Sequence, residues 1–141
     1  MESSPLALAV ERIGDRWTLL IVDALMAGPL KFGELEAHVT GTTSGIAPTV
    51  LTKRLRQLEA DGIVVGRPYT ERPVRLIYEL TGPGAALAGA VHLLRDWGAA
   101  VAGDDTPATH PACGSPLTTR LWCASCEQVV DPGEADQNIV L

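Results

Sequence analysis

The chain has 141 residues, 46% of them hydrophobic, and a formal net charge of −6 at pH 7. This length predicts one domain with a small appendage, and the apolar fraction is enough for a hydrophobic core. No apolar run reaches the roughly 18 residues of a membrane span, and the N-terminus has neither the basic region nor the cleavage site of a secretory signal. We therefore expect a soluble, cytoplasmic protein.

The negative charge does not exclude a nucleic-acid partner, because it is unevenly distributed. Residues 103–141 carry six acidic residues and one arginine, a local charge of −5. Residues 43–80 carry six basic and four acidic residues, a local charge of +2. The middle of the chain is basic and its C-terminal part is acidic, so the isoelectric point of the whole chain is a poor guide to its partner.

Two helices are predicted first. Residues 5–14 have apolar positions at helical spacing, and Gly14 is a suitable stop. Residues 15–28 begin with Asp15, a favourable N-cap, and end at Gly28-Pro29, a pair typical of helix ends. The second helix is apolar over a broad surface, so we expect it to be largely buried.

Two further helices follow, separated by a loop. Residues 31–39 predict a short helix with Gly33 as N-cap and Glu36 at the third helical position. Residues 40–45 predict a loop from their Thr, Ser and Gly content. Residues 47–62 predict the clearest helix of the chain, because a proline suits its first turn and a glycine its end.

The helix over 47–62 has two different faces. At about 100° per residue, its leucines fall within one narrow arc. The opposite arc is polar and basic, without an acid, and consists of Thr49, Thr52, Lys53 and Arg56. Next, residues 63–70 and 74–81 are β-branched and aromatic runs that predict a hairpin with arginines near its tip. A long alanine-rich helix over 84–102 follows.

This order predicts a mainly α protein with a small β-hairpin (α+β). A short helix followed by a helix with a basic outer face is a helix-turn-helix arrangement. A two-stranded hairpin directly after it is the wing of a winged helix-turn-helix. Such a fold puts the second helix of the motif in the DNA major groove and the wing against phosphates or the minor groove.

The sequence also resembles a known family. The segments "ERIGDRWTLLIVDAL", "KFGELEAHV", "GIAPTVLTKRLRQLEADGIV" and "VRLIYELTGPG" resemble, in order and spacing, the HxlR family of bacterial winged helix-turn-helix transcription regulators. This resemblance covers roughly residues 4–98. It implies a homodimer, paired through helices 5–13 and 84–98, that binds a pseudo-palindromic operator as a repressor or an activator. It leaves open a small-molecule effector.

Two departures from the family pattern stand out. Many family members carry a cysteine immediately before the first-helix proline, and in several it senses oxidants or electrophiles. Here Ser4 precedes Pro5, which excludes thiol sensing at that position. The loop over 40–45 is also a few residues longer than the family's turn, a change that costs little free energy.

The predicted DNA contacts come from the helix face and from the wing. On the helix, Lys53 and Arg56 would contact guanine or phosphate, and Thr49 and Thr52 phosphate or a thymine methyl. On the wing, Arg72 and Arg75 would contact phosphates. The alternatives are a solvated helix face and an ordinary hairpin surface, which would leave a winged-helix protein-interaction module without DNA binding.

Other basic and aromatic residues have structural interpretations. Arg67 could pair with Glu79 across the hairpin, and Arg54 could pair with an acid. Trp17 and Trp97 are better explained as core or dimer-interface residues than as ligand contacts. No phosphate-binding loop, nucleophile elbow or H-E-x-x-H motif is present, so we expect no enzyme.

The appendage holds all three cysteines. In a domain arrangement of 1–102, a linker over 103–109, a small domain over 110–132 and a tail over 133–141, the small domain contains two pairs at metal-ligand spacing. They are His110 with Cys113 and Cys123 with Cys126, which predict a structural zinc site with four protein ligands. The alternatives are a Cys123–Cys126 redox pair and a flexible tail, and zinc or oxidation here could control operator binding.

Overall fold

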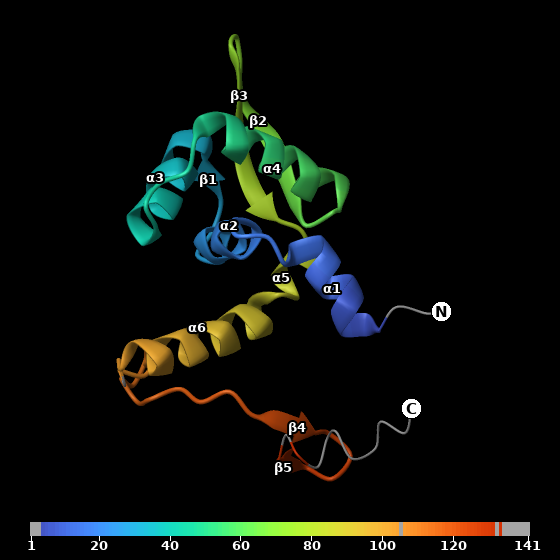
Figure 1. Cartoon of the computed structure of the whole chain (residues 1–141), viewed down its shortest axis with the longest axis vertical. Helices are drawn as coiled ribbons and strands as arrows, with labels where there is room; N and C mark the ends of the chain where they lie inside the picture. The colour runs from blue at the N-terminus through green and yellow to red at the C-terminus, as the bar shows by residue number, and fades with distance from the viewer. Residues whose placement is uncertain (1–3, 105, 132, 134–141) are drawn as a thin grey trace. The chain divides into compact units, whose positions relative to one another are not determined.

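The computed structural model describes residues 4–104, 106–131 and 133 (Figure 1). The predicted tail therefore lies outside the described residues except for Gly133. The chain forms two compact units, 1–91 and 92–141. Within the described ranges, no helix is both long and apolar enough to cross a membrane.

The first unit begins with two helices. α1 (Pro5–Ile13) ends at Gly14, as predicted, and the Ser4 hydroxyl caps its start by accepting a hydrogen bond from the backbone N–H of Ala7 at 3.1 Å. α2 (Thr18–Leu25) is largely buried, as expected. It is shorter at both ends than the predicted 15–28, because turns occupy its first and last predicted residues.

Asp15 stabilises the start of α2 even though the helix begins three residues later. Its Oδ1 accepts hydrogen bonds from the backbone N–H groups of Trp17 at 2.8 Å and of Thr18 at 3.0 Å. The buried Thr18 hydroxyl donates to Oδ2 of the same carboxylate. The Nε of Arg54, from a helix further along the chain, lies 3.4 Å from Oδ1. Asp15 thus connects a helix start to the core and to a distant arginine.

Replacing Asp15 by alanine is expected to lower the free energy of unfolding at neutral pH by about 1–2 kcal/mol, the usual cost of a lost N-terminal cap and ion pair. Burial raises the pKa of the carboxyl, but hydrogen bonds from Thr18 and Trp17 and the charge of Arg54 outweigh burial, so the pKa lies below its ordinary value. Because the folded-state pKa is depressed, the contribution is present above about pH 3.9 and is lost as the pH falls through the folded-state pKa.

Urea unfolding of the wild type and Asp15→Ala at a series of pH values measures this dependence. The difference between the two proteins should shrink below about pH 4. Glu11→Ala, which removes an exposed carboxylate from α1, is the control and should change little. A difference that stays constant down to about pH 3 would contradict the assigned role of the carboxylate.

A two-residue strand, absent from the sequence prediction, precedes the third helix. β1 (Leu30–Lys31) leads directly into α3 (Phe32–Thr42). The predicted cap, Gly33 with Glu36, is wrong, because Lys31 is the N-cap and its backbone N–H donates to Oε2 of Glu34 at 2.8 Å. The N-cap is therefore two residues earlier in the chain than predicted.

The loop predicted over 40–45 is partly helical. α3 continues to Thr42, and the hydroxyls of Thr42 and Thr43 donate to the backbone carbonyl of Val39 at 2.9 and 3.0 Å. These bonds satisfy a carbonyl of the last turn, which the composition of the segment did not predict. The turn between the two helices of the motif is thus shortened to residues 43–47.

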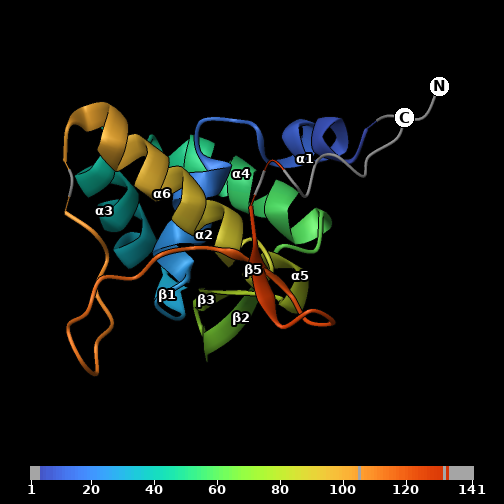
Figure 2. The same cartoon turned by 90° about the horizontal axis from the view of Figure 1, so that it is seen from below.

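The helix of the predicted recognition element and the wing come next. α4 (Pro48–Ala60) ends within two residues of the prediction, and Gly62 has a φ of +71°. β2 (Val64–Glu71) and β3 (Val74–Leu80) form the predicted antiparallel hairpin. β1 pairs with the outer edge of β3, which gives a three-stranded sheet in the order β1-β3-β2 (Figure 2). In Figure 1 the hairpin extends well beyond the helices beside it.

One hydrophobic core holds the elements of this unit together. It is built from buried side chains of α2, α3, α4, the start of β2 and the beginning of the last helix. The largest fully buried residues are Ile21, Leu35, Leu51, Leu55, Leu58, Val22, Val39, Val64 and Thr18. Trp17 is half-buried against this core, as expected for a structural tryptophan.

The single long helix predicted over 84–102 is wrong in its first part. A four-residue helix, α5 (Gly82–Ala85), is capped by Thr81, whose hydroxyl accepts from the backbone N–H of Gly84 at 3.1 Å. α6 (Ala88–Ala102) starts after a turn at residues 86–87. A Cβ on Gly84 would lie 2.1 Å from the backbone carbonyl oxygen of Ile63, so this close approach requires glycine.

The second unit contains most of α6 and two small hairpin turns. α6 ends at Gly103, which has a φ of +73°. An isolated bridge pairs Thr109 with Pro116, and β4 (Leu121–Cys123) pairs with β5 (Gln128–Val130). Between residues 106 and 131 every described residue is exposed except Cys123 and Val130, which are half-buried. This part of the chain therefore has no hydrophobic core of its own.

Candidate nucleic-acid interface

The two faces of α4 are as the sequence predicts. Leu51, Leu55 and Leu58 are buried in the core with at most 1% of their surface exposed. The side of α4 that faces away from the core carries the predicted polar and basic residues. Because one face is anchored by three leucines, the direction in which the other face points is set by core packing rather than by flexible loops.

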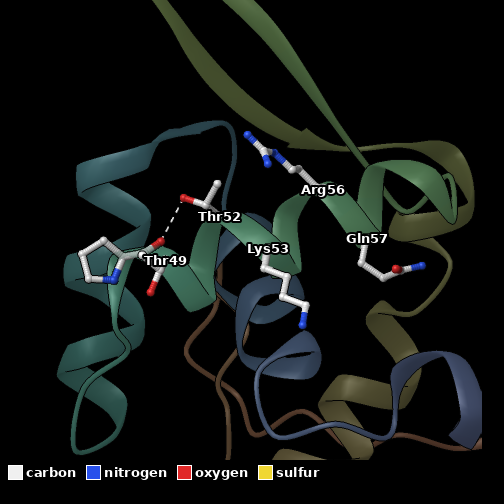
Figure 3. Close-up of a pocket in the computed structure, with 6 residues that line it drawn as sticks. Thr49, Thr52, Lys53, Arg56 and Gln57 are labelled. Carbon is white, nitrogen blue, oxygen red and sulfur yellow. Dashed lines mark hydrogen bonds between the residues drawn. The ribbon is translucent and has the colours of Figure 1, made fainter.

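The outer face of α4 is a shallow open groove (Figure 3). It is lined by Pro48, Thr49, Thr52, Lys53, Arg56 and Gln57. All four predicted residues of the helix therefore lie together on one surface. Gln57 was not among the predicted contacts, although its position one turn after Lys53 puts it on the same face. Its Nε2 lies 3.3 Å from the carboxylate oxygens of Asp61, which holds the amide along the helix.

The hydroxyl of Thr52 already has a partner within the helix. It donates to the backbone carbonyl of Pro48 at 2.9 Å, the dashed contact in Figure 3. Its proton is therefore engaged, and what it offers outward is a methyl group and an oxygen that can accept. Thr49 is exposed on the same face, one turn before Lys53 (Figure 3).

The remaining arginine of α4 has a structural partner. Arg54 pairs with Asp15 at 3.4 Å, which confirms the predicted pairing with an acid. Its side chain is half-buried, whereas Lys53 and Arg56 on either side are exposed. The basic residues of α4 thus have two roles. Arg54 links α4 to the start of α2, and Lys53 and Arg56 face solvent.

The wing carries one paired and two exposed arginines. Arg67 pairs with Glu79 on the neighbouring strand, as predicted. Arg72 lies in the turn between the strands, and Arg75 stands opposite Thr70 close to that turn. The Thr70 hydroxyl donates to the carbonyl of Pro73 at 2.7 Å and so closes the turn. Arg72 and Arg75 are therefore exposed cations at the tip of the hairpin.

The wing and α4 are joined at their bases. Oε1 of Glu59, near the end of α4, accepts a hydrogen bond from the backbone N–H of Gly66 in β2 at 2.9 Å. Tyr78 lies in the same region: burial and then the negative charge of Glu59 raise its pKa, while Arg56 acts in the opposite direction. These contacts couple the orientation of the wing to that of the exposed helix face.

A second link joins the wing to the start of α3. The Nζ of Lys31 lies over the ring of Tyr69 at 4.9 Å from the ring centre, a cation–π contact. Tyr69 occupies the irregular position of the hairpin, where the register of β2 shifts. Neither residue was a predicted contact. Lys31 adds a further positive charge beside the wing, on the same groove as Arg75.

The four predicted zinc ligands are placed as two pairs. Nδ1 of His110 lies 3.3 Å from Sγ of Cys113, and the Cys126 thiol is hydrogen-bonded to Cys123. Across the described part of the chain, no group of three or more His, Cys, Asp or Glu residues is arranged to hold a metal ion. The structure thus brings each pair together but does not bring the two pairs into one cluster.

Comparison with known proteins agrees with this architecture. The family model described as HxlR-like helix-turn-helix matches residues 12–106. A relative from Mycobacterium tuberculosis, named as an HTH-type transcriptional regulator, is 32% identical over 133 residues, which cover 92% of this chain and 81% of that protein.

Two solved structures are similar in fold. The reduced form of the redox regulator HypR is 31% identical, with a TM-score of 0.62 over 69% of this chain and 92% of that one. A protein from Pseudomonas aeruginosa described as a transcription factor is 27% identical, with a TM-score of 0.66. That match covers 92% of this chain and 88% of the other, so it extends past α6 into the cysteine-containing segment.

Proposed function

Because the chain belongs to the HxlR-like helix-turn-helix family, we propose that it regulates transcription by binding double-stranded DNA at specific sequences. The observation that carries this proposal is the outer face of α4. Lys53 and Arg56 are exposed on it, no acid is among the residues that line their groove, and the groove lies next to a wing that presents further arginines. Such a surface is complementary to the phosphates and base edges of the major groove.

Different residues of this surface would make different contacts. Arg56, which lines the groove, has the fork of donors that matches guanine O6 and N7. Lys53 would contact guanine or phosphate, and the methyl group of Thr52 suits a thymine methyl, because the hydroxyl proton is engaged within the helix. Thr49, near the N-terminus of α4, would accompany backbone N–H groups that favour phosphate. Arg72 and Arg75 would hold the DNA backbone.

The proposed active form is a homodimer. α1 exposes Leu6, Leu8 and Val10, and α6 exposes Leu93, Leu94, Trp97 and Val101. Trp97 has 69% of its surface exposed, so it is not a core residue of the single chain. A place in the dimer interface would explain an exposed tryptophan. A two-fold dimer would present two copies of α4 related by the symmetry axis, and a pseudo-palindromic operator would match that symmetry.

Selection of bound DNA from a pool of random duplexes tests this function. The full-length protein should enrich a pseudo-palindromic sequence bound by two chains. Binding should weaken steeply with salt, because phosphate contacts release counterions. A protein that enriches no sequence and shows no salt-dependent affinity for any duplex would instead be a winged-helix module for protein interaction, and the proposal would fail.

Replacing Arg72 by alanine is expected to change the salt dependence of binding. Each phosphate contact contributes about −0.9 to the slope of log affinity against log salt, so loss of one per chain should flatten that slope by about one for each half-site. Titrations of the selected duplex at a series of salt concentrations measure it. The preference for the selected duplex over a scrambled one should not change, and an unaltered slope would remove Arg72 from the phosphate contacts.

A further inference from the structure

Two turns in the C-terminal unit share one backbone design. His110 and Cys113 enclose two residues, as do Cys123 and Cys126. In each turn the residue after the second member has a left-handed backbone: Gly114 has a φ of +69° and Glu127 a φ of +53°. Among the described residues, Glu127 is the non-glycine with positive φ. Since such a conformation is uncommon for a residue with a side chain, its recurrence at equivalent positions indicates a shared role.

Each turn also sits at the end of a small hairpin. The first is closed by hydrogen bonds from the backbone N–H of His110 to the carbonyl of Ser115 at 2.8 Å and from that of Gly114 to the carbonyl of His110 at 2.7 Å. The second joins β4 to β5, whose last pair is Cys123 with Gln128. A pair of short hairpins that each carry two ligand-type residues in the turn is the arrangement that holds tetrahedral zinc in small domains.

The distance within the first pair fits a shared metal ion. Zn–S bonds of about 2.3 Å and Zn–N bonds of about 2.0–2.1 Å at a tetrahedral angle set the two ligand atoms roughly 3.6 Å apart. The 3.3 Å between Nδ1 of His110 and Sγ of Cys113 is close to that separation. The first turn therefore needs little change for His110 and Cys113 to bind the same metal ion.

Apolar burial does not explain why this segment folds. The strands of its hairpin are three residues long, and no described residue from 106 to 131 is buried. Trp122 and Val129 form a cross-strand pair but are 61% and 55% exposed. An isolated two-stranded hairpin of this size is marginal in water, so a segment of this kind requires another source of folding free energy.

We propose that the C-terminal unit binds one zinc ion per chain through His110, Cys113, Cys123 and Cys126. Residues 117–120, which lie outside helices and strands, connect the two hairpins and allow the turns to close on the metal. Because no three of the ligands converge in the structure, closure is part of binding, and the binding free energy becomes folding free energy. Four protein ligands leave no open position, so the zinc is structural and not catalytic.

Cobalt titration of the reduced, metal-free, full-length protein tests the site, because Co²⁺ reports its ligands and geometry by absorption. The expected result is one Co²⁺ per chain, with thiolate charge-transfer absorption and the intense visible bands of a tetrahedral site, both lost when Zn²⁺ is added. No binding, half a metal per chain, or octahedral bands would each overturn the proposal.

Variants identify the ligands. Cys113→Ser and Cys123→Ser, one from each turn, should abolish the tetrahedral spectrum, and His110→Ala should weaken Co²⁺ binding roughly tenfold or more. Ser125→Ala is the matched control: it lies between two ligands in the second turn and should bind as the wild type does. A spectrum unchanged in Cys113→Ser would show that the two turns do not share a metal.

Limited digestion with trypsin gives a second readout that does not depend on DNA binding. Arg120 is the only lysine or arginine after residue 102 and lies in the connection between the two hairpins. Zinc should slow cleavage after Arg120 at least several-fold in the wild type and in Ser125→Ala, and should not slow it in Cys123→Ser. Equal cleavage with and without zinc in the wild type would contradict closure of the turns on the metal.

Discussion

Replacing Leu55 by alanine is expected to lower the free energy of unfolding by about 2–5 kcal/mol, the usual range for a fully buried leucine. Leu55 lies in the middle of α4 with 1% of its surface exposed and belongs to the core cluster. The loss combines the transfer free energy of the removed atoms with the cavity they leave. Since typical domains are stable by only 5–15 kcal/mol, the variant should be close to the limit of folding.

Val50→Ala is the matched control for this prediction, since it shortens an aliphatic side chain of the same helix that is 40% exposed. Its expected cost is within about 1 kcal/mol. Both are measured by urea unfolding followed by circular dichroism. Equal costs for the two substitutions would contradict the assignment of Leu55 to the buried face, and with it the direction in which the opposite face of α4 points.

Replacing Arg56 by alanine is expected to weaken binding to the selected duplex by about 1–3 kcal/mol, roughly 5-fold to 150-fold. Arg56 is exposed on the outer face of α4 and lines its groove (Figure 3). Because a bidentate contact to guanine distinguishes base pairs, the variant should also lose preference at one position of each half-site. Its fold should be intact, since the side chain is outside the core.

The control for Arg56→Ala is Arg67→Ala, which removes the same charge from the wing. Arg67 is paired with Glu79, so its loss should reduce affinity less and leave the base preference unchanged. Fluorescence titrations against the selected duplex and single-base variants compare the two. If Arg56→Ala leaves both affinity and base preference unchanged, the reading of bases by this residue is ruled out.

The elements that were well predicted from the sequence are those with a strong local pattern. α4 has leucines at strict helical spacing and a proline at its start, and its observed ends lie within two residues of the predicted ones. The hairpin of β2 and β3 was predicted from β-branched runs on either side of a short turn. The pairing of Arg67 with Glu79 followed from their places on neighbouring strands, whereas for Arg54 the sequence predicted an acid without identifying Asp15.

The elements that were missed depend on partners distant in the chain. β1 has two residues and exists only because β3 offers an edge, so no local pattern can predict it. The separate short helix α5 lies against a segment distant in the chain, since a Cβ on Gly84 would lie 2.1 Å from the backbone carbonyl oxygen of Ile63. The cap of α3 was misassigned because Glu34 and Glu36 are both at plausible spacing, and only the structure distinguishes them.

The candidate site was predicted in kind and partly in detail. The residues on the outer face of α4 follow from helical geometry, and Gln57 could have been added by the same angular argument. The Lys31–Tyr69 contact could not, because it joins the start of α3 to an irregular position of the wing. For the cysteine-containing segment, the spacing predicted the pairs; closure of the four ligands on a metal stays a prediction.

Methylation interference on the selected duplex tests the central claim, that a pair of α4 helices reads the major groove. Guanine N7 lies in the major groove and adenine N3 in the minor groove, so methylation at each blocks one groove. We predict two groups of interfering guanine N7 positions, with centres about 10–10.5 base pairs apart or a multiple of that spacing. Interference confined to adenine N3, or a single group of positions, would contradict major-groove reading by a two-fold dimer.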